Sequence, residues 1–381
     1  MKNNNTITQP TEAMRLFLWI CLVIGWTTLA QGQKGWYVEG SLHLGHAFKH
    51  RSTITIDFPD WSLGAEINLE RKTYGTKPWH ERCGFPRWGI AIAYHYTGNA
   101  QQMGHGIAIL PNVTVDFIRK KHWRLFGRLG VGLGIITRPY DRQTNPLNNM
   151  VGSYLNNNTS LRLGMAIDLH PQWQLRPSAT FTHYSNAAST LPNLGINIPS
   201  FQLGLCYRPN PVAKEDYIYA AERPIRNKRI QFSFLAAAGL RELLTSNGAK
   251  YPVWQTSIDA GLFLNPNNRL KMGIEYDYIA AYYVFNKHNG GYEDKDLHWQ
   301  ASRLTLFIAD EIFIGRFSIN AQVGVYLTQN MDQLSPISIR VAARYYLLDP
   351  YQNLPAPFLT ISMKAHRIIA EYFSVGAGIA F

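Results

Sequence analysis

The sequence predicts an all-β protein, an antiparallel β-barrel of the outer-membrane type. Hydrophobic residues make up 46% of the 381 residues, yet the mean hydropathy is only −0.18, because apolar and polar residues alternate. Aromatic residues reach 13% and there are 30 glycines, a composition that favours strands joined by turns. The third observation is an N-terminal export signal, which sends the chain out of the cytoplasm.

The only long apolar run, residues 16–30, has the features of a secretory signal peptide. Lys2 and Arg15 precede it, and it ends in small residues at cleavage-site spacing. Its length of about 15 residues is short for a membrane-spanning helix, which needs about 20. We therefore expect residues 1–32 to be a signal peptide. Cys21 lacks the preceding small residues of a lipoprotein site, so no lipid anchor is expected.

Eight segments with period-two alternation follow, and we expect them to form one barrel over residues 33–208. One side of each segment is apolar with aromatic residues toward the ends, and the other is small, polar or charged. A water-soluble sandwich would show the same alternation, but the signal peptide, the long strands and the aromatic ends favour a membrane barrel. The segments lie around 36–44, 60–71, 86–97, 105–117, 123–137, 155–169, 171–185 and 197–208.

Residues 209–228 are polar and contain prolines, which is typical of a linker between domains. Alternation then resumes in eight further segments that start near 229, 251, 269, 297, 316, 336, 358 and 371. The last alternates up to the terminal Phe381, which resembles the assembly signal of bacterial outer-membrane barrels. The sequence thus predicts a second eight-stranded, barrel-like domain over 229–381; one barrel of about sixteen strands is the alternative.

A polar group lies on the lipid-facing side of the seventh and eighth segments. His183 and Ser185 share the side that carries Phe181, because residues two apart in a strand point the same way. Asn197 has the same parity on the next strand. If the N-terminus is periplasmic, the seventh strand ends at the outer leaflet. A serine nucleophile, a histidine base and an asparagine that holds the imidazole form a plausible hydrolytic set.

Backbone amides around Asn186 and Ala188 are the candidates for an oxyanion hole, because the chain turns there from strand into loop. The second half of the chain contains no His-x-Ser pair, so no catalysis is assigned to it.

The run His-Tyr-Ser-Asn-Ala at 183–187, followed by Pro-Asn-Leu-Gly at 192–195, resembles the signature of the lipid A 3-O-deacylase (PagL-type) family, often labelled acyloxyacyl hydrolase. The resemblance covers residues 34–208. It implies an eight-stranded outer-membrane barrel that hydrolyses the ester at position 3 of lipid A without a cofactor. Ser185 and His183 match the family's nucleophile and base. The family's third residue is a glutamate, and this sequence has Asn197 there.

The leading hypothesis is therefore an outer-membrane esterase whose substrate is lipid A, as part of lipopolysaccharide. The net charge of +12 fits an anionic membrane or lipid head group, and nothing resembles a nucleic-acid module. The alternative is a non-enzymatic barrel, namely a porin, adhesin or structural protein with a degenerate site. Acyl transfer to an acceptor other than water would use the same residues.

Three further groups carry weaker expectations. His43, His46 and His50 cluster near the first strand, but the opposite parity of His43 and His46 argues against a metal site. A disulfide between the two cysteines of the exported chain is chemically permitted. The charged residues of the predicted outer loop 138–153 could meet lipid A phosphates, because arginine suits phosphate, although an ordinary solvated loop would look the same. The two cysteines are Cys83 and Cys206. The charged residues of the loop are Arg138, Asp141 and Arg142.

Overall fold

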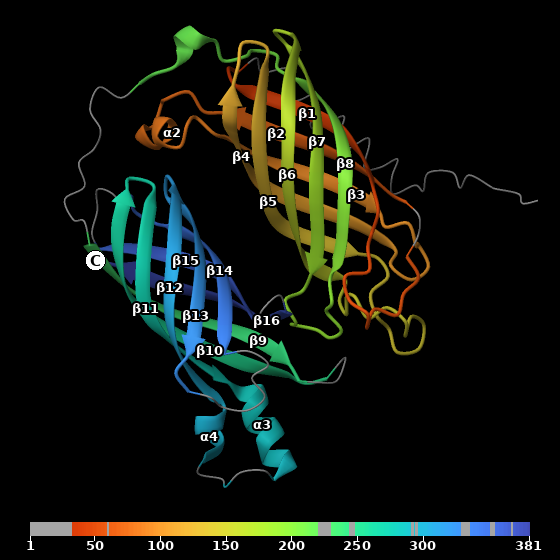
Figure 1. The fold of residues 1–381 in the computed structure, drawn as a ribbon, viewed down its shortest axis with the longest axis vertical. Helices are drawn as coiled ribbons and strands as arrows, with labels where there is room; N and C mark the ends of the chain where they lie inside the picture. Colours follow the sequence, from red (N-terminus) through yellow and green to blue (C-terminus); the bar gives the residue numbers. More distant parts are fainter. Residues whose placement is uncertain are drawn as a thin grey trace, which may run out of the picture.

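A computed structural model describes residues 33–381 except 59–60, 220–229, 244–247, 291–292, 294–295, 329–335, 351–354 and 367–368. The expected signal peptide and most of the second half of the expected linker lie outside the described residues. The first eight strands form a closed antiparallel barrel, sealed by the pairing of β1 with β8 (Figure 1). The strands are β1 Trp36–Gly45, β2 Ser62–Lys72, β3 Arg87–Tyr96, β4 His105–Arg119, β5 Trp123–Ile136, β6 Leu155–His170, β7 Trp173–Ser185 and β8 Ile196–Tyr207.

The next eight strands close into a second barrel through the pairing of β16 with β9. The prediction of two barrels is thus confirmed, and the single barrel of about sixteen strands is wrong. Hydrogen bonding explains why, since β8 pairs back to β1 rather than onward to β9. The strands are β9 Ile230–Glu242, β10 Lys250–Asn265, β11 Asn268–Ile279, β12 Ser302–Ile314, β13 Phe317–Tyr326, β14 Ile337–Tyr346, β15 Ala356–His366 and β16 Ile369–Ala380.

Short helices occupy some connections. α2 (Pro78–Arg82) lies between β2 and β3 and begins with proline, which suits the first turn of a helix. α3 (Ala280–Asn289) and α4 (Leu297–Gln300) lie between β11 and β12. The strand expected from about 297 therefore begins at Ser302 instead. No described helix has the length and apolar character needed to cross a membrane.

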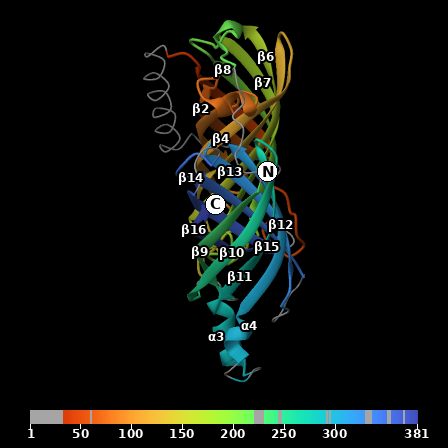
Figure 2. The same cartoon turned by 90° about the vertical axis from the view of Figure 1, so that its left-hand side faces the viewer.

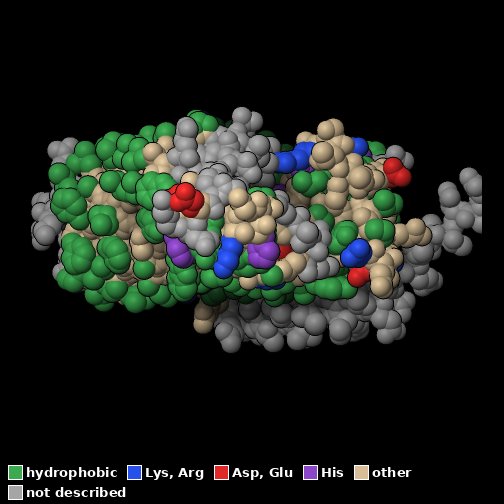
Figure 3. Space-filling model, turned by 90° about the horizontal axis from the view of Figure 1, so that it is seen from below, with side chains coloured by type: hydrophobic (Ala, Val, Ile, Leu, Met, Phe, Trp, Pro, Cys, Tyr) green, Lys and Arg blue, Asp and Glu red, His purple; other side chains and the backbone are tan. Residues whose placement is uncertain are grey.

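Both barrels turn their apolar residues outward. Exposed fractions along the strands alternate, and large outward side chains remain bare, such as Leu42 at 70% and Ile258 at 63%. In Figure 3, which shows the molecule from below, hydrophobic side chains cover most of the left-hand part of the surface. An apolar outer wall is the surface that lipid tails require.

Charged pairs fill the interiors. In the first barrel Glu39 accepts hydrogen bonds from Arg162 at 2.5 Å and Arg176 at 2.8 Å. In the second, Arg340 donates to Glu275 at 2.9 Å. Eight-stranded barrels are just wide enough for side chains to fill. These packed interiors argue against the porin alternative.

The two ends of each barrel differ. We call the end with the β4–β5 and β6–β7 turns of the first barrel, and the β10–β11 and β12–β13 turns of the second, the turn end. The opposite end is the loop end, which carries the long β1–β2, β5–β6 and β7–β8 connections and the helices α3 and α4. Figures 1 and 2 both show α3 and α4 projecting beyond the strands. Buried apolar residues close the first barrel here: Ala47, Ile54, Ile56, Met103, Met150, Val151, Ile196 and Ile198.

Candidate active site

Tyr184 fixes which way the end of β7 faces. Its ring lies inside the barrel, and its hydroxyl is 2.9 Å from His95 Nδ1. Gly106 and Gly134 make room for it, since a Cβ at either position would lie within 2.7 Å of the ring or its hydroxyl. Because neighbours in a strand point to opposite sides, His183 and Ser185 face outward at the loop end.

The structure brings His183 and Asn197 together. They are opposite each other in the β7–β8 ladder, and His183 Nδ1 lies 2.6 Å from Asn197 Oδ1. An amide oxygen only accepts hydrogen bonds, so Nδ1 must carry the proton. The other ring nitrogen, Nε2, then has a free lone pair. This is the tautomer that a general base needs.

His50 supports Asn197 from the β1–β2 loop. Asn197 Nδ2 is 3.1 Å from His50 Nδ1, and His50 Nε2 is 3.0 Å from the Leu194 carbonyl. An amide nitrogen only donates, so His50 Nδ1 accepts and His50 Nε2 donates to Leu194. The three hydrogen bonds that link Leu194, His50, Asn197 and His183 thus each join a donor to an acceptor. The sequence indicated His50 only as part of a histidine cluster.

That cluster does not assemble. His43 points into the barrel, where its ring packs edge-on against His95 at 5.4 Å between centroids. Within the described ranges, no three His, Cys, Asp or Glu side chains are placed to hold a metal ion. Cys83 and Cys206 are both free thiols.

Two polar residues of β6 complete the outward patch, and sequence reasoning missed both. Asn157 lies opposite Ser185 in the ladder, and Thr159 lies opposite His183. Thr159 Oγ1 donates to Asn157 Oδ1 at 2.8 Å, while Asn157 Nδ2 donates to the Gly132 carbonyl at 3.1 Å. The available signal was polar residues at two successive outward positions of β6, just before the exposed Leu161.

The loop after Ser185 is held by Asn186. Its amide donates to Asn193 Oδ1 at 2.9 Å, and its Nδ2 donates to Ser153 Oγ and to the Thr190 carbonyl, both at 2.8 Å. The amide of Asn186 is therefore engaged within the loop, and its side chain ties the β5–β6 and β7–β8 connections together.

Ala187 and Ala188 follow in the left-handed region, with φ of 51° and 60°. Two successive non-glycine residues in this region are unfavourable, at roughly 1 kcal/mol or more each, and such strain gathers at functional sites. In the described part of the chain, no acceptor is paired with their backbone amides. Among the described residues, these are the unengaged backbone N–H groups that follow Ser185 most closely in the sequence.

Gly195 lies close to the imidazole of His183. It has a φ of +84°, and a Cβ there would lie 2.6 Å from His183 Cε1. We predict that Gly195→Ala displaces the imidazole and lowers activity on the order of 10- to 100-fold, the usual result of moving a reacting group by about 1 Å. Fatty-acid release from lipid A, the reaction that the sequence resemblance implies, measures this. Gly290→Ala is the matched control, with φ +62° and open space around it, and equal losses in both variants would contradict the argument.

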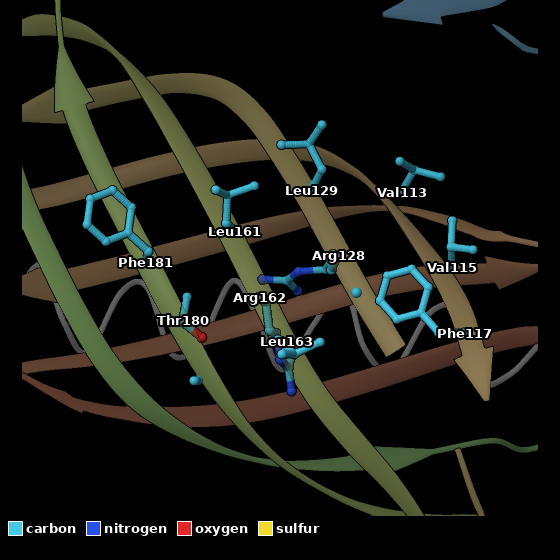
Figure 4. A pocket seen from close by; sticks show the side chains of 12 residues that line it. Val113, Val115, Phe117, Arg128, Leu129, Leu161, Arg162, Leu163, Thr180 and Phe181 are labelled. Atoms are coloured by element: carbon cyan, nitrogen blue, oxygen red, sulfur yellow. The ribbon is translucent and has the colours of Figure 1, made fainter. Parts of the chain in front are cut away.

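An apolar groove of about 600 Å³ runs over the outer faces of β4 to β7 (Figure 4). It ends at Phe181, two residues from His183 on the same side. Arg128 and Arg162 also border the groove, but their charged ends point away from it, because their guanidinium groups pair with Glu66 and Glu39 inside the barrel. The groove is lined by Val113, Val115, Phe117, Gly127, Leu129, Leu161, Leu163, Ala179, Thr180 and Phe181.

The β5–β6 loop presents exposed arginines at the loop end of the first barrel. Asp141 accepts hydrogen bonds from the amides of Thr144 and Gln143 at 2.7 and 3.0 Å, and from the Thr144 hydroxyl at 2.9 Å. These bonds hold the pKa of Asp141 below its ordinary value. Asp141 therefore shapes its turn, while Arg138 and Arg142 are exposed.

Three solved structures are similar to one half of the chain. The outer membrane enzyme PagL is 17% identical, with a TM-score of 0.32, covering 44% of this chain and 97% of its own. Neisserial surface protein A is 10% identical, with a TM-score of 0.31, covering 46% and 97%. Ail of Yersinia pestis is 12% identical, with a TM-score of 0.28, covering 46% and 99%. No curated protein sequence matches the chain.

Family sequence models match both halves. Residues 63–206 match lipid A 3-O-deacylase (PagL), and residues 230–381 match the acyloxyacyl hydrolase C-terminal domain. The first match runs from β2 to β8 of the first barrel, and the second spans β9 to β16, the whole second barrel. The chain is an outer-membrane β-barrel protein that belongs to the lipid A 3-O-deacylase (PagL) family.

Proposed function

We propose that the protein is an outer-membrane esterase that hydrolyses the acyl ester at position 3 of lipid A, with Ser185 as nucleophile and His183 as base. The observation that carries this proposal is the 2.6 Å bond from His183 Nδ1 to Asn197 on the outward side of the barrel, where His183 is partly exposed and Asn197 and Ser185 are buried. The bond leaves Nε2 unprotonated two residues from Ser185. A polar patch on that side of a barrel has a use when the substrate itself is a lipid.

The chemistry follows from these positions. His183 Nε2 takes the proton of Ser185 Oγ as the oxygen attacks the ester carbonyl. The oxyanion that forms is stabilised by the N–H groups of Ala187 and Ala188. Collapse expels the sugar alkoxide, which receives the proton from His183, and leaves an acyl-serine. Water, deprotonated by His183, then releases the fatty acid and regenerates Ser185.

Two surfaces suit the rest of the substrate. The groove that ends at Phe181 follows the membrane-facing wall and fits an acyl chain. Arg138 and Arg142 lie at the loop end, where the phosphates of an outer-leaflet lipid would be.

Mass spectrometry of lipid A from cells with and without the protein tests the proposal. We expect loss of one 3-hydroxyacyl chain from position 3 and its recovery as free acid. Identical lipid A in both strains would support a non-enzymatic barrel instead. The same acyl chain found on another acceptor would indicate acyl transfer.

Filling the groove tests the acyl site. We predict that Ala179→Trp lowers the rate on long-chain lipid A by roughly three- to tenfold. The effect is moderate because the chain moves from lipid into the groove, so that close packing rather than transfer from water is lost. Rates on lipid A of different chain length measure it. Leu203→Trp, on the lipid-facing wall of β8 outside the groove, is the matched control, and equal rates in the two variants would argue against the groove.

A further inference from the structure

The second barrel contacts the first at both ends. At the turn end, Asn267 Nδ2 donates to the Arg82 carbonyl at 2.6 Å, and Cys83 Sγ lies 3.5 Å from the Phe313 carbonyl. Burial raises the pKa of the Cys83 thiol to about 11, so the thiol keeps its proton and donates. Gly315 packs against Trp79, whose Nε1 would lie 3.0 Å from a Cβ there.

At the loop end, the second barrel contacts the β7–β8 loop. Glu242, the last residue of β9, accepts a hydrogen bond from the Leu191 amide. Lys250, its partner in the β9–β10 ladder, donates to Thr190 Oγ1 at 3.1 Å. The carbonyl of Thr190 in turn accepts from Asn186, the residue next to Ser185.

The position of Glu242 is unusual for a barrel strand. Even-numbered residues of β9 face lipid, as the exposed Ile230, Phe232 and Phe234 show, yet Glu242 on the same parity is only 3% exposed. A buried carboxylate on the lipid-facing side of a membrane strand is costly and usually has a function. Here the β7–β8 loop covers it.

We propose that the second barrel positions the catalytic loop, with Glu242 and Lys250 as positioning residues for Ser185 and for the Ala187 and Ala188 amides. The inference rests on the proposed function and gives the second barrel a part in it. Alanine disfavours the left-handed conformation, so the backbone at Ala187 and Ala188 must be stabilised by contacts from outside this segment. Glu242 and Lys250 bind Leu191 and Thr190 in that loop. Asn186, the residue next to Ser185, is bonded to Thr190 in turn.

The test compares Glu242→Leu with Glu242→Gln in full-length protein reconstituted with lipopolysaccharide. Leucine removes the acceptor for the Leu191 amide, whereas glutamine keeps one. We expect Glu242→Leu to lower kcat by about 10- to 100-fold with little change in KM, and Glu242→Gln to restore most of the loss. Asn267→Ala, which breaks a contact at the other end, should leave kcat unchanged.

Wild-type kcat in Glu242→Leu, or equal losses in Glu242→Leu and Asn267→Ala, would overturn the proposal. Amide hydrogen exchange of residues 186–195 provides a readout that does not depend on activity. Exchange should accelerate in Glu242→Leu and remain slow in Glu242→Gln and Asn267→Ala. If the wild-type protein releases no fatty acid but shows this pattern, the proposed reaction is wrong while the hold on the loop stands. Unchanged exchange in Glu242→Leu would refute the hold itself.

Discussion

Ser185→Ala should abolish the release of 3-hydroxy fatty acid from lipid A, with a fall of about 10⁴-fold or more. Removal of the nucleophile leaves only the contributions of binding and of the oxyanion donors, which account for the activity that usually remains in hydrolases of this type. The barrel should be unaffected, because Ser185 ends β7 and its side chain points away from the interior ion pairs. Mass spectrometry of the lipid and of the released acid measures the loss.

Heat-modifiable migration on a gel shows whether the variant barrel is folded. Ser189→Ala is the matched control in the same loop, and it should retain wild-type release. Persistent release by a folded Ser185→Ala variant would show that another group attacks the ester, and the mechanism given above would then be wrong.

The parts of the site that lie close in sequence were predictable. Period-two alternation places His183, Ser185 and Asn197 on the outer wall, and adjacency of β7 and β8 brings Asn197 opposite His183. Both inferences need only local geometry and a hairpin. The division into two barrels followed from the polar, proline-containing segment near 209–228.

The contacts made by long loops were not predictable. His50 meets Asn197 across a sequence separation of 147, and no periodicity reports where a long loop folds back. The Glu242 contact joins two barrels, so its only trace in the sequence is an acidic residue on a lipid-facing parity. That anomaly is visible in β9 once its parity is assigned, and it marks the place where a strand faces protein instead of lipid.

Asn197→Leu should lower activity by roughly 10²- to 10⁴-fold, the range seen when the group that orients a catalytic histidine is lost. Leucine has the branched shape and the same number of side-chain heavy atoms as asparagine but no acceptor for His183 Nδ1–H, so the ring is free to turn and to adopt the other tautomer. His50→Ala removes only the support behind Asn197, and we expect a smaller loss, on the order of tenfold. Rates of fatty-acid release from these folded variants establish the order.

Asn197→Asp tests whether an amide is sufficient at this position. The carboxylate would still accept from His183 Nδ1 and would add a full charge that stabilises the imidazolium formed during attack. It would no longer donate to His50, whose Nδ1 would have to take a proton and become the donor. We therefore expect Asn197→Asp to reach or exceed wild-type activity, provided that His50 is present to donate to the carboxylate. A loss as large as that of Asn197→Leu would mean that accepting from His183 is not sufficient. The hydrogen bond from Asn197 Nδ2 to His50, which holds the β1–β2 loop against the site, would then be required as well.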